Sequence, residues 1–79
     1  MDRGLLQRRL ERAEENISLG EKRLDLQRKV IAVLEMTGQG SSPTAARARD
    51  LLASIEESQR RDTETRHQLQ EMIKRMPAA

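Results

Sequence analysis

Few residues in this sequence have types and spacings that could carry chemistry, and the clearest set lies in the C-terminal half. Glu64 and His67 are three residues apart, and Glu71 follows one helical turn after His67. On a helix this is the Glu-x-x-His spacing by which di-iron bundles hold metal. The ligands in such bundles point into the core, whereas the apolar periodicity described below turns Glu64 and His67 toward solvent. We therefore expect no metal site, and the sequence assigns no role to His67.

No arrangement of side chains in the sequence is typical of a catalytic site. The chain has no cysteine, no tyrosine and a single histidine, so disulfides, cysteine-based zinc sites and thiol nucleophiles are excluded. Gly38 and Gly40 stand in a polar, serine-containing loop and match no phosphate-binding motif. We expect a protein that is not an enzyme and that needs no cofactor.

Charged residues make up 35% of the chain and leave a net charge of +2. Acidic residues interleave with the arginines along the sequence, so no basic arm is expected. The absence of Phe, Tyr and Trp removes the platforms on which single-stranded bases stack. A weak nucleic-acid-associated regulator is the alternative function, and its candidate residues are Arg47, Arg49, Arg60 and Arg61.

Neither a membrane span nor a secretion signal is recognisable in the sequence. No apolar run approaches the ~20 residues that a spanning helix needs, and the charged start Met1-Asp2-Arg3 is unlike a signal peptide. In the first half of the chain the bases alternate with glutamates, so a helix lying on an anionic membrane surface is not expected. We expect a cytoplasmic protein without a membrane partner.

One polar segment divides the chain into two long helical stretches. Gly38 suits the left-handed position that follows a helix, and Ser42 with Pro43 suits the N-cap and first position of the next helix. The composition is rich in Ala, Glu, Leu and Arg, which is typical of coiled coils. The prediction is an all-α helical hairpin, a single domain over 1–79, with helices at about 3–36 and 43–76 and a loop at 37–42.

Apolar residues recur three and four residues apart in both stretches, which is the heptad seam of a coiled coil. In the second stretch the seam is apolar at its ends and polar in its middle, because no large apolar residue occurs between Glu56 and Gln68. We predict that this seam joins the two antiparallel helices. Its members include Leu10, Ile17, Leu24 and Ile31 of the first helix and Leu52, Ile55, Leu69 and Ile73 of the second.

The first helix carries a second apolar stripe, on which Leu5, Leu19, Leu26 and Val33 share one heptad position. At ~100° per residue this stripe lies more than about 120° from the seam, so one antiparallel partner cannot cover both. We therefore expect self-association, most simply as a homodimer of hairpins that forms a four-helix bundle. The predicted contact with a second copy, or with an unidentified protein partner, comprises Leu19, Gly20, Leu26, Val30 and Val33.

Gly20 lies inside the seam near the middle of the first helix, where glycine costs ~1 kcal/mol relative to alanine. Two explanations stay open. The glycine permits a close approach between two copies of the first helix, or it faces solvent or the second helix, opposite the polar stretch near Gln59 and Asp62.

From Ile17 onward the chain resembles a group of short, uncharacterised alphaproteobacterial proteins, over roughly two-thirds of its length. The shared residues are Ile17, Gly20, Glu21, Gln27, Arg28, Ile31, Leu34, Glu35, Ala48, Arg49, Leu51, Leu52 and Glu56. Members often carry histidines where this chain has Asn16 and Arg23, so no metal or proton role of those histidines carries over. The resemblance implies a helical hairpin from a soil or plant-associated bacterium and no particular activity. The expected function is that of a non-catalytic interaction or scaffold module.

Overall fold

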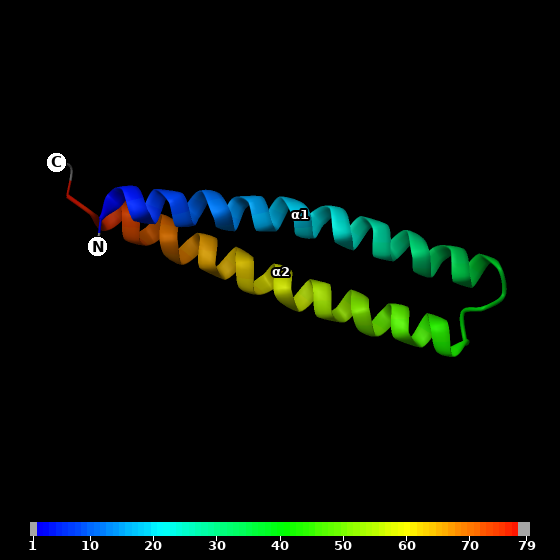
Figure 1. Cartoon of the computed structure of the whole chain (residues 1–79). Coiled ribbons are helices and arrows are strands. Elements are labelled where there is room, and N and C mark those ends of the chain that lie inside the picture. Colours follow the sequence, from blue (N-terminus) through cyan, green and yellow to red (C-terminus); the bar gives the residue numbers. More distant parts are fainter. Residues whose placement is uncertain (1, 78–79) are drawn as a thin grey trace.

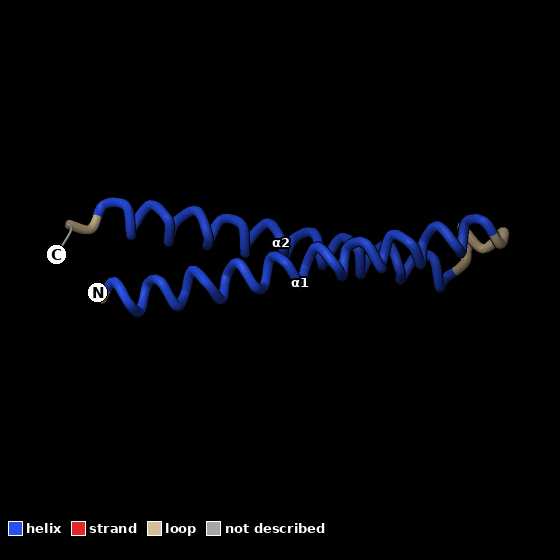
Figure 2. The backbone as a smooth tube through the Cα atoms, turned by 90° about the horizontal axis from the view of Figure 1, so that it is seen from above, coloured by secondary structure: helices blue, strands red, loops and turns tan. Residues whose placement is uncertain are grey.

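The protein is described by a computed structural model that covers residues 2–77. It consists of two α-helices, α1 (Arg3–Met36) and α2 (Pro43–Arg75), which lie antiparallel in a rod with Cα extents of 61 × 14 × 13 Å (Figure 1). The helices overlap toward the termini in Figure 1 and toward the loop in the view from above (Figure 2), so they wind around each other. The predicted all-α helical hairpin is confirmed, and each helix begins and ends within one residue of its predicted bounds.

The loop between the helices is fixed by backbone and side-chain caps. At the end of α1 the amide of Gln39 donates to the carbonyl of Leu34 at 2.7 Å, as in a Schellman motif. This motif needs a left-handed residue, and Gly38 supplies it with a φ of 78°. At the start of α2 the Ser42 hydroxyl accepts a hydrogen bond from the amide of Ala45 at 3.1 Å, which satisfies an otherwise free helix N–H group. The predicted cap residues are therefore confirmed.

The core is the seam between the two helices. At the terminal end, Leu6 is 2% exposed and packs with the buried side chains of Ala13 and Leu69. Toward the loop the buried residues are Ile31, Ala45 and Ala48, and Ala45 is fully buried. The sequence analysis did not single out Ala45, although it continues the same heptad spacing. Of the predicted seam residues, Ile17, Ile31 and Leu69 are buried, and Leu10, Leu24, Leu52, Ile55 and Ile73 are half-buried.

Side-chain hydrogen bonds join the two helices at two places along the seam, one in its polar middle and one toward the loop. The amide of Gln59 on α2 donates to the carbonyl of Ile17 on α1 at 2.8 Å, and Gln27 on α1 donates to the carbonyl of Ala48 on α2 at 2.8 Å. Gln59 fits because Gly20 is buried beside it and has no side chain; a Cβ there would collide with the Gln59 amide oxygen. Of the two explanations for Gly20, the structure shows the contact with α2. These bonds fix the register of the two helices.

We expect Leu6→Ala to lower the free energy of unfolding by about 2–5 kcal/mol, because it leaves a cavity in the terminal core. Its neighbour Leu5 is 36% exposed, so Leu5→Ala should cost less, about 1–2 kcal/mol by lost burial alone. Urea unfolding followed by circular dichroism at one protein concentration measures both losses. Equal losses in the two variants would contradict the observed seam.

The contact between Gly20 and Gln59 predicts an interaction energy between these positions. In the natural chain, Gly20→Ala displaces Gln59, and the lost contact offsets the gain of ~1 kcal/mol that alanine brings to a helix interior. In a chain that already carries Gln59→Ala, the same change should be stabilising by about that amount. A double-mutant cycle by urea unfolding tests this, and identical effects of Gly20→Ala in the two backgrounds would refute it.

Candidate functional site

The second apolar stripe of α1 is open to solvent in the hairpin. The exposed fractions are 51% for Leu19, 63% for Leu26, 48% for Val30 and 58% for Val33. The physical reason is that α2 is the single neighbour of α1 and lies over the seam. Among residues 2–77 these four side chains therefore have no packing partner that could bury them.

Side chains on either side of the seam belong to different faces of the hairpin. With the seam at heptad positions a and d, the g and c positions of the two helices lie on one side and the e and b positions on the other. Leu19 of α1 and Leu51 and Ser58 of α2, all at g or c, line one groove together. Glu35 and Arg49, both at e, form an ion pair across the other side. We call the first side the g/c face and the second the e/b face.

The g/c face collects exposed apolar side chains from both helices. Leu51 of α2 is 52% exposed and Met72 is 44% exposed, and they join the stripe of α1. These two residues were not predicted as part of a contact surface, because the sequence of α2 taken alone shows no second apolar stripe. Among residues 2–77, one large exposed apolar residue lies off this face: Met36, at an f position beside the loop. The exposed apolar residues of the g/c face are Leu5, Leu19, Leu26, Val30, Val33, Leu51 and Met72.

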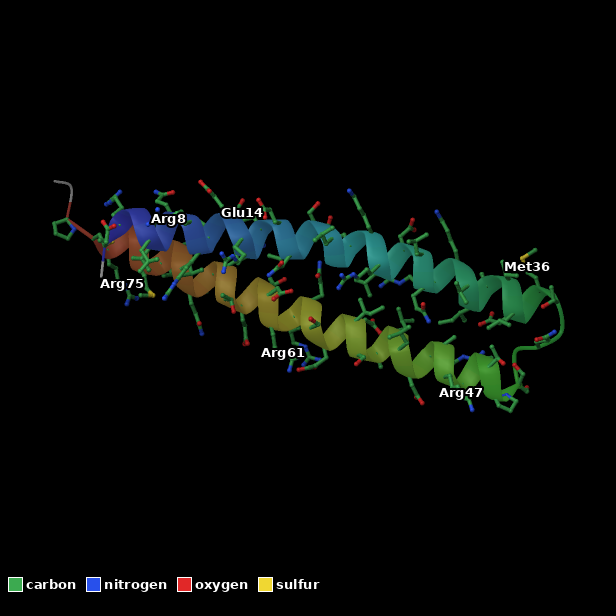
Figure 3. All side chains as sticks on the ribbon, in the orientation of Figure 1. Arg8, Glu14, Met36, Arg47, Arg61 and Arg75 are labelled. Carbon is green, nitrogen blue, oxygen red and sulfur yellow. The ribbon has the colours of Figure 1, made fainter. Side chains whose placement is uncertain are left out.

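Arginines accompany these apolar residues on the g/c face. Between residues 3 and 76, the g and c positions contain six arginines and no acidic residue. The order of charges along the chain conceals this separation of six arginines, whereas the other bases share the e, b, f and seam positions with the acids. Arg47, Arg61 and Arg75 are spaced along the whole of α2 (Figure 3). The complete set is Arg9, Arg12, Arg23, Arg47, Arg61 and Arg75, and all six are exposed.

The acidic residues lie on the e/b face and along the outer f positions. The exceptions are the N-cap Asp2 and Asp62, a half-buried seam residue at the edge of the g/c groove. The ion pairs of the described chain, which are Lys29–Asp25, Arg49–Glu35 and Arg60–Glu57, all lie off the g/c face. The acidic residues of the e, b and f positions are Glu11, Glu14, Glu15, Glu21, Asp25, Glu35, Asp50, Glu56, Glu57, Glu64 and Glu71.

This distribution divides the arginines proposed for the alternative, nucleic-acid-binding function. Arg49 and Arg60 lie at e and b positions and pair with Glu35 and Glu57. Arg47 and Arg61 lie at c positions on the other side. The four therefore do not form one surface that a single phosphate backbone could follow.

A groove of about 390 Å³ runs between the helices on the g/c face. Leu19 and Leu51 stand on its two sides, and Arg23 extends along it. Its base includes the Gln59 side chain, which occupies the space beside Gly20, and the short side chain of Ser58. The groove is a place on the g/c face where a large apolar side chain of another molecule can enter between the two helices. A smaller hollow of about 270 Å³, lined by Arg9, Arg12 and Leu69 among others, lies on the same face toward the termini.

Glu64 and His67 are exposed on α2, away from the seam. Across residues 2–77, no three acidic or histidine side chains come close enough together to hold a metal ion. In the same range, neither helix contains an apolar stretch that could cross a bilayer.

Comparison with known proteins gives no match: no family model, no curated protein and no solved structure is similar to this chain. The resemblance to the alphaproteobacterial group stays a prediction, and inference about function depends on the g/c face.

Proposed function

We propose that the protein is a non-catalytic interaction module that binds other helices through the g/c face. In the absence of another partner, two copies associate through this face as a homodimer of hairpins. The observation that carries the proposal is the cluster of half-exposed Leu and Val side chains between Leu19 and Val33 of α1, joined by Leu51 of α2.

Clustered apolar exposure supports this function. Single exposed apolar residues are common on protein surfaces, but a contiguous group marks a contact site. Residues 19–33 rise about 21 Å along the helix axis at ~1.5 Å per residue. Burying these side chains against another helix removes several half-exposed Leu and Val residues from water, which is the main source of association free energy.

The size of the face is sufficient for a specific complex. It is two helices wide and as long as the helices, and so measures about 20 Å by 50 Å, or roughly 1,000 Å². Stable protein complexes bury about 800 Å² on each partner. The apolar half near the loop covers less than this, so a stable complex must also use the terminal half, where Arg9, Arg12 and Arg61 lie.

Charge weakens the homodimer. Two copies that meet through this face bring arginines together without acidic partners, apart from Asp62 at the groove edge. Repulsion between exposed charges is screened by salt, and the screening length falls from ~10 Å at 0.1 M to ~3 Å at 1 M. Self-association through the g/c face therefore strengthens as salt is added.

We predict a concentration-dependent equilibrium between the 9.1 kDa monomer and a dimer, shifted toward the dimer by raising sodium chloride from 0.05 M to 0.5 M. Sedimentation equilibrium at protein concentrations from micromolar to millimolar measures it. Leu26→Asp places a charge in the middle of the apolar cluster and should leave only monomer. Its control is Ala32→Asp, an equal change of charge at an exposed b position of α1, which should dimerise like the natural chain.

Circular dichroism of both variants checks that the helices are intact. A natural chain that stays monomeric at every salt and protein concentration would refute the homodimer. Equal dimerisation of Leu26→Asp and Ala32→Asp would show that the contact does not use the g/c face.

A further inference from the structure

The g/c face combines two features: half-exposed apolar side chains from both helices, and arginines that form no ion pair within residues 2–77. Any partner that covers the apolar side chains also takes Arg23 and Arg61 partly out of water. Removing an unpaired charge from water is costly, and a carboxylate placed beside it offsets this cost. The partner that fits the face therefore supplies apolar side chains and negative charge together.

We propose that the preferred partner of this protein is an acidic amphipathic helix that lies along the g/c groove and completes a three-helix bundle. This inference depends on the proposed function, because it names the occupant of the same face. The partner presents a stripe of large apolar side chains to the groove, and acidic residues flank that stripe.

The shape of the face favours a helix as the partner. Leu19 and Leu51 form the two sides of a groove, and the short side chain of Ser58 leaves room between them, so apolar side chains spaced three and four residues apart can enter it. Toward the loop, the exposed side chains of Val30 and Val33 continue this apolar surface along α1. Recognition of an amphipathic helix in an apolar groove is a common mode of peptide binding, and a third helix lying over a coiled-coil hairpin reproduces the packing of a helical bundle.

Charge complementarity selects an acidic helix over a second copy of the chain. A second hairpin presents the same arginines that the first one carries, whereas glutamates flanking an apolar stripe can pair with Arg23 on one side and Arg61 on the other. A nucleic-acid backbone would also neutralise these arginines, but it offers no apolar surface to Leu26, Val30 or Val33. An anionic bilayer is flat and does not fill the groove.

The experiment uses the full chain and two fluorescent helical peptides of 21 residues. Each peptide has Leu at the a and d positions and Ala or Gln at b, c and f. The acidic peptide has Glu at e and g, and the matched control peptide has Lys there. Fluorescence anisotropy measures binding at 0.05, 0.15 and 0.5 M sodium chloride. We expect saturable binding of the acidic peptide, weakened at least tenfold across this salt range, and no binding of the lysine peptide.

Variants of the protein locate the charge effect. Arg23→Gln with Arg61→Gln should weaken binding of the acidic peptide about tenfold, since each exposed ion pair is worth up to ~1 kcal/mol. The control, Lys22→Gln with Arg60→Gln, removes the same charge from the adjacent positions, which lie off the g/c face. It should change the affinity less than about twofold. Leu26→Asp should remove peptide binding, while Ala32→Asp should not.

Three results would overturn the inference. The first is equal binding of the acidic and lysine peptides, and the second is an equal loss of affinity in the g/c double variant and in its control double variant. The third is no binding of the acidic peptide. In the last case, binding of phosphatidylglycerol vesicles or of duplex DNA under the same conditions would identify a membrane or a nucleic acid as the partner of the face. The proposed function is judged separately by sedimentation. Dimerisation that depends on Leu26, without peptide binding, would keep the module and reject the acidic partner.

Discussion

Each helix of this hairpin has one neighbour, and that single contact can bury one stripe of side chains. In α1 the stripe that α2 covers is the seam, which runs from the almost fully buried Leu6 to Ile31. The other stripe, around Leu26, has to stay at the surface for the same geometric reason. The stability of the fold and the availability of an apolar binding face are therefore two consequences of one constraint.

The seam itself is weak in apolar contacts at its middle, and polar side chains form hydrogen bonds across it there and toward the loop. Gln59 reaches across to the backbone of α1 beside Gly20, and Gln27 reaches in the opposite direction to the backbone of α2. Such bonds contribute less to stability than a buried leucine would, because hydrogen bonds to water are lost when they form. Their geometry, however, is met in one register only. The register in turn determines which residues of α2 lie beside the exposed stripe of α1. It therefore places Leu51 and Leu19 on the two sides of one groove.

The charge distribution has a different effect on each side of the rod. On the e/b face, acids and bases alternate and form exposed pairs such as Arg49 with Glu35, which is typical of a solvated helix surface and adds little stability. On the g/c face, arginines stand beside leucines and valines without acids. The net charge of +2 is a sum over all sides of the rod, so composition conceals the feature on which our proposal about the partner depends.

The sequence by itself determined the two helices, the loop and the seam, because helix periodicity and the caps at Gly38 and Ser42 are local properties of the chain. It also determined that Leu19, Leu26, Val30 and Val33 lie off the seam, since their angle from it follows from residue spacing. Only the tertiary structure decided that the Gln59 side chain packs against Gly20 and that Leu51 lies beside the apolar stripe of α1. It also decided that arginines of both helices lie on the g/c face. These features depend on how the two helices are rotated and shifted against each other, and that arrangement is set by contacts between residues far apart in the chain.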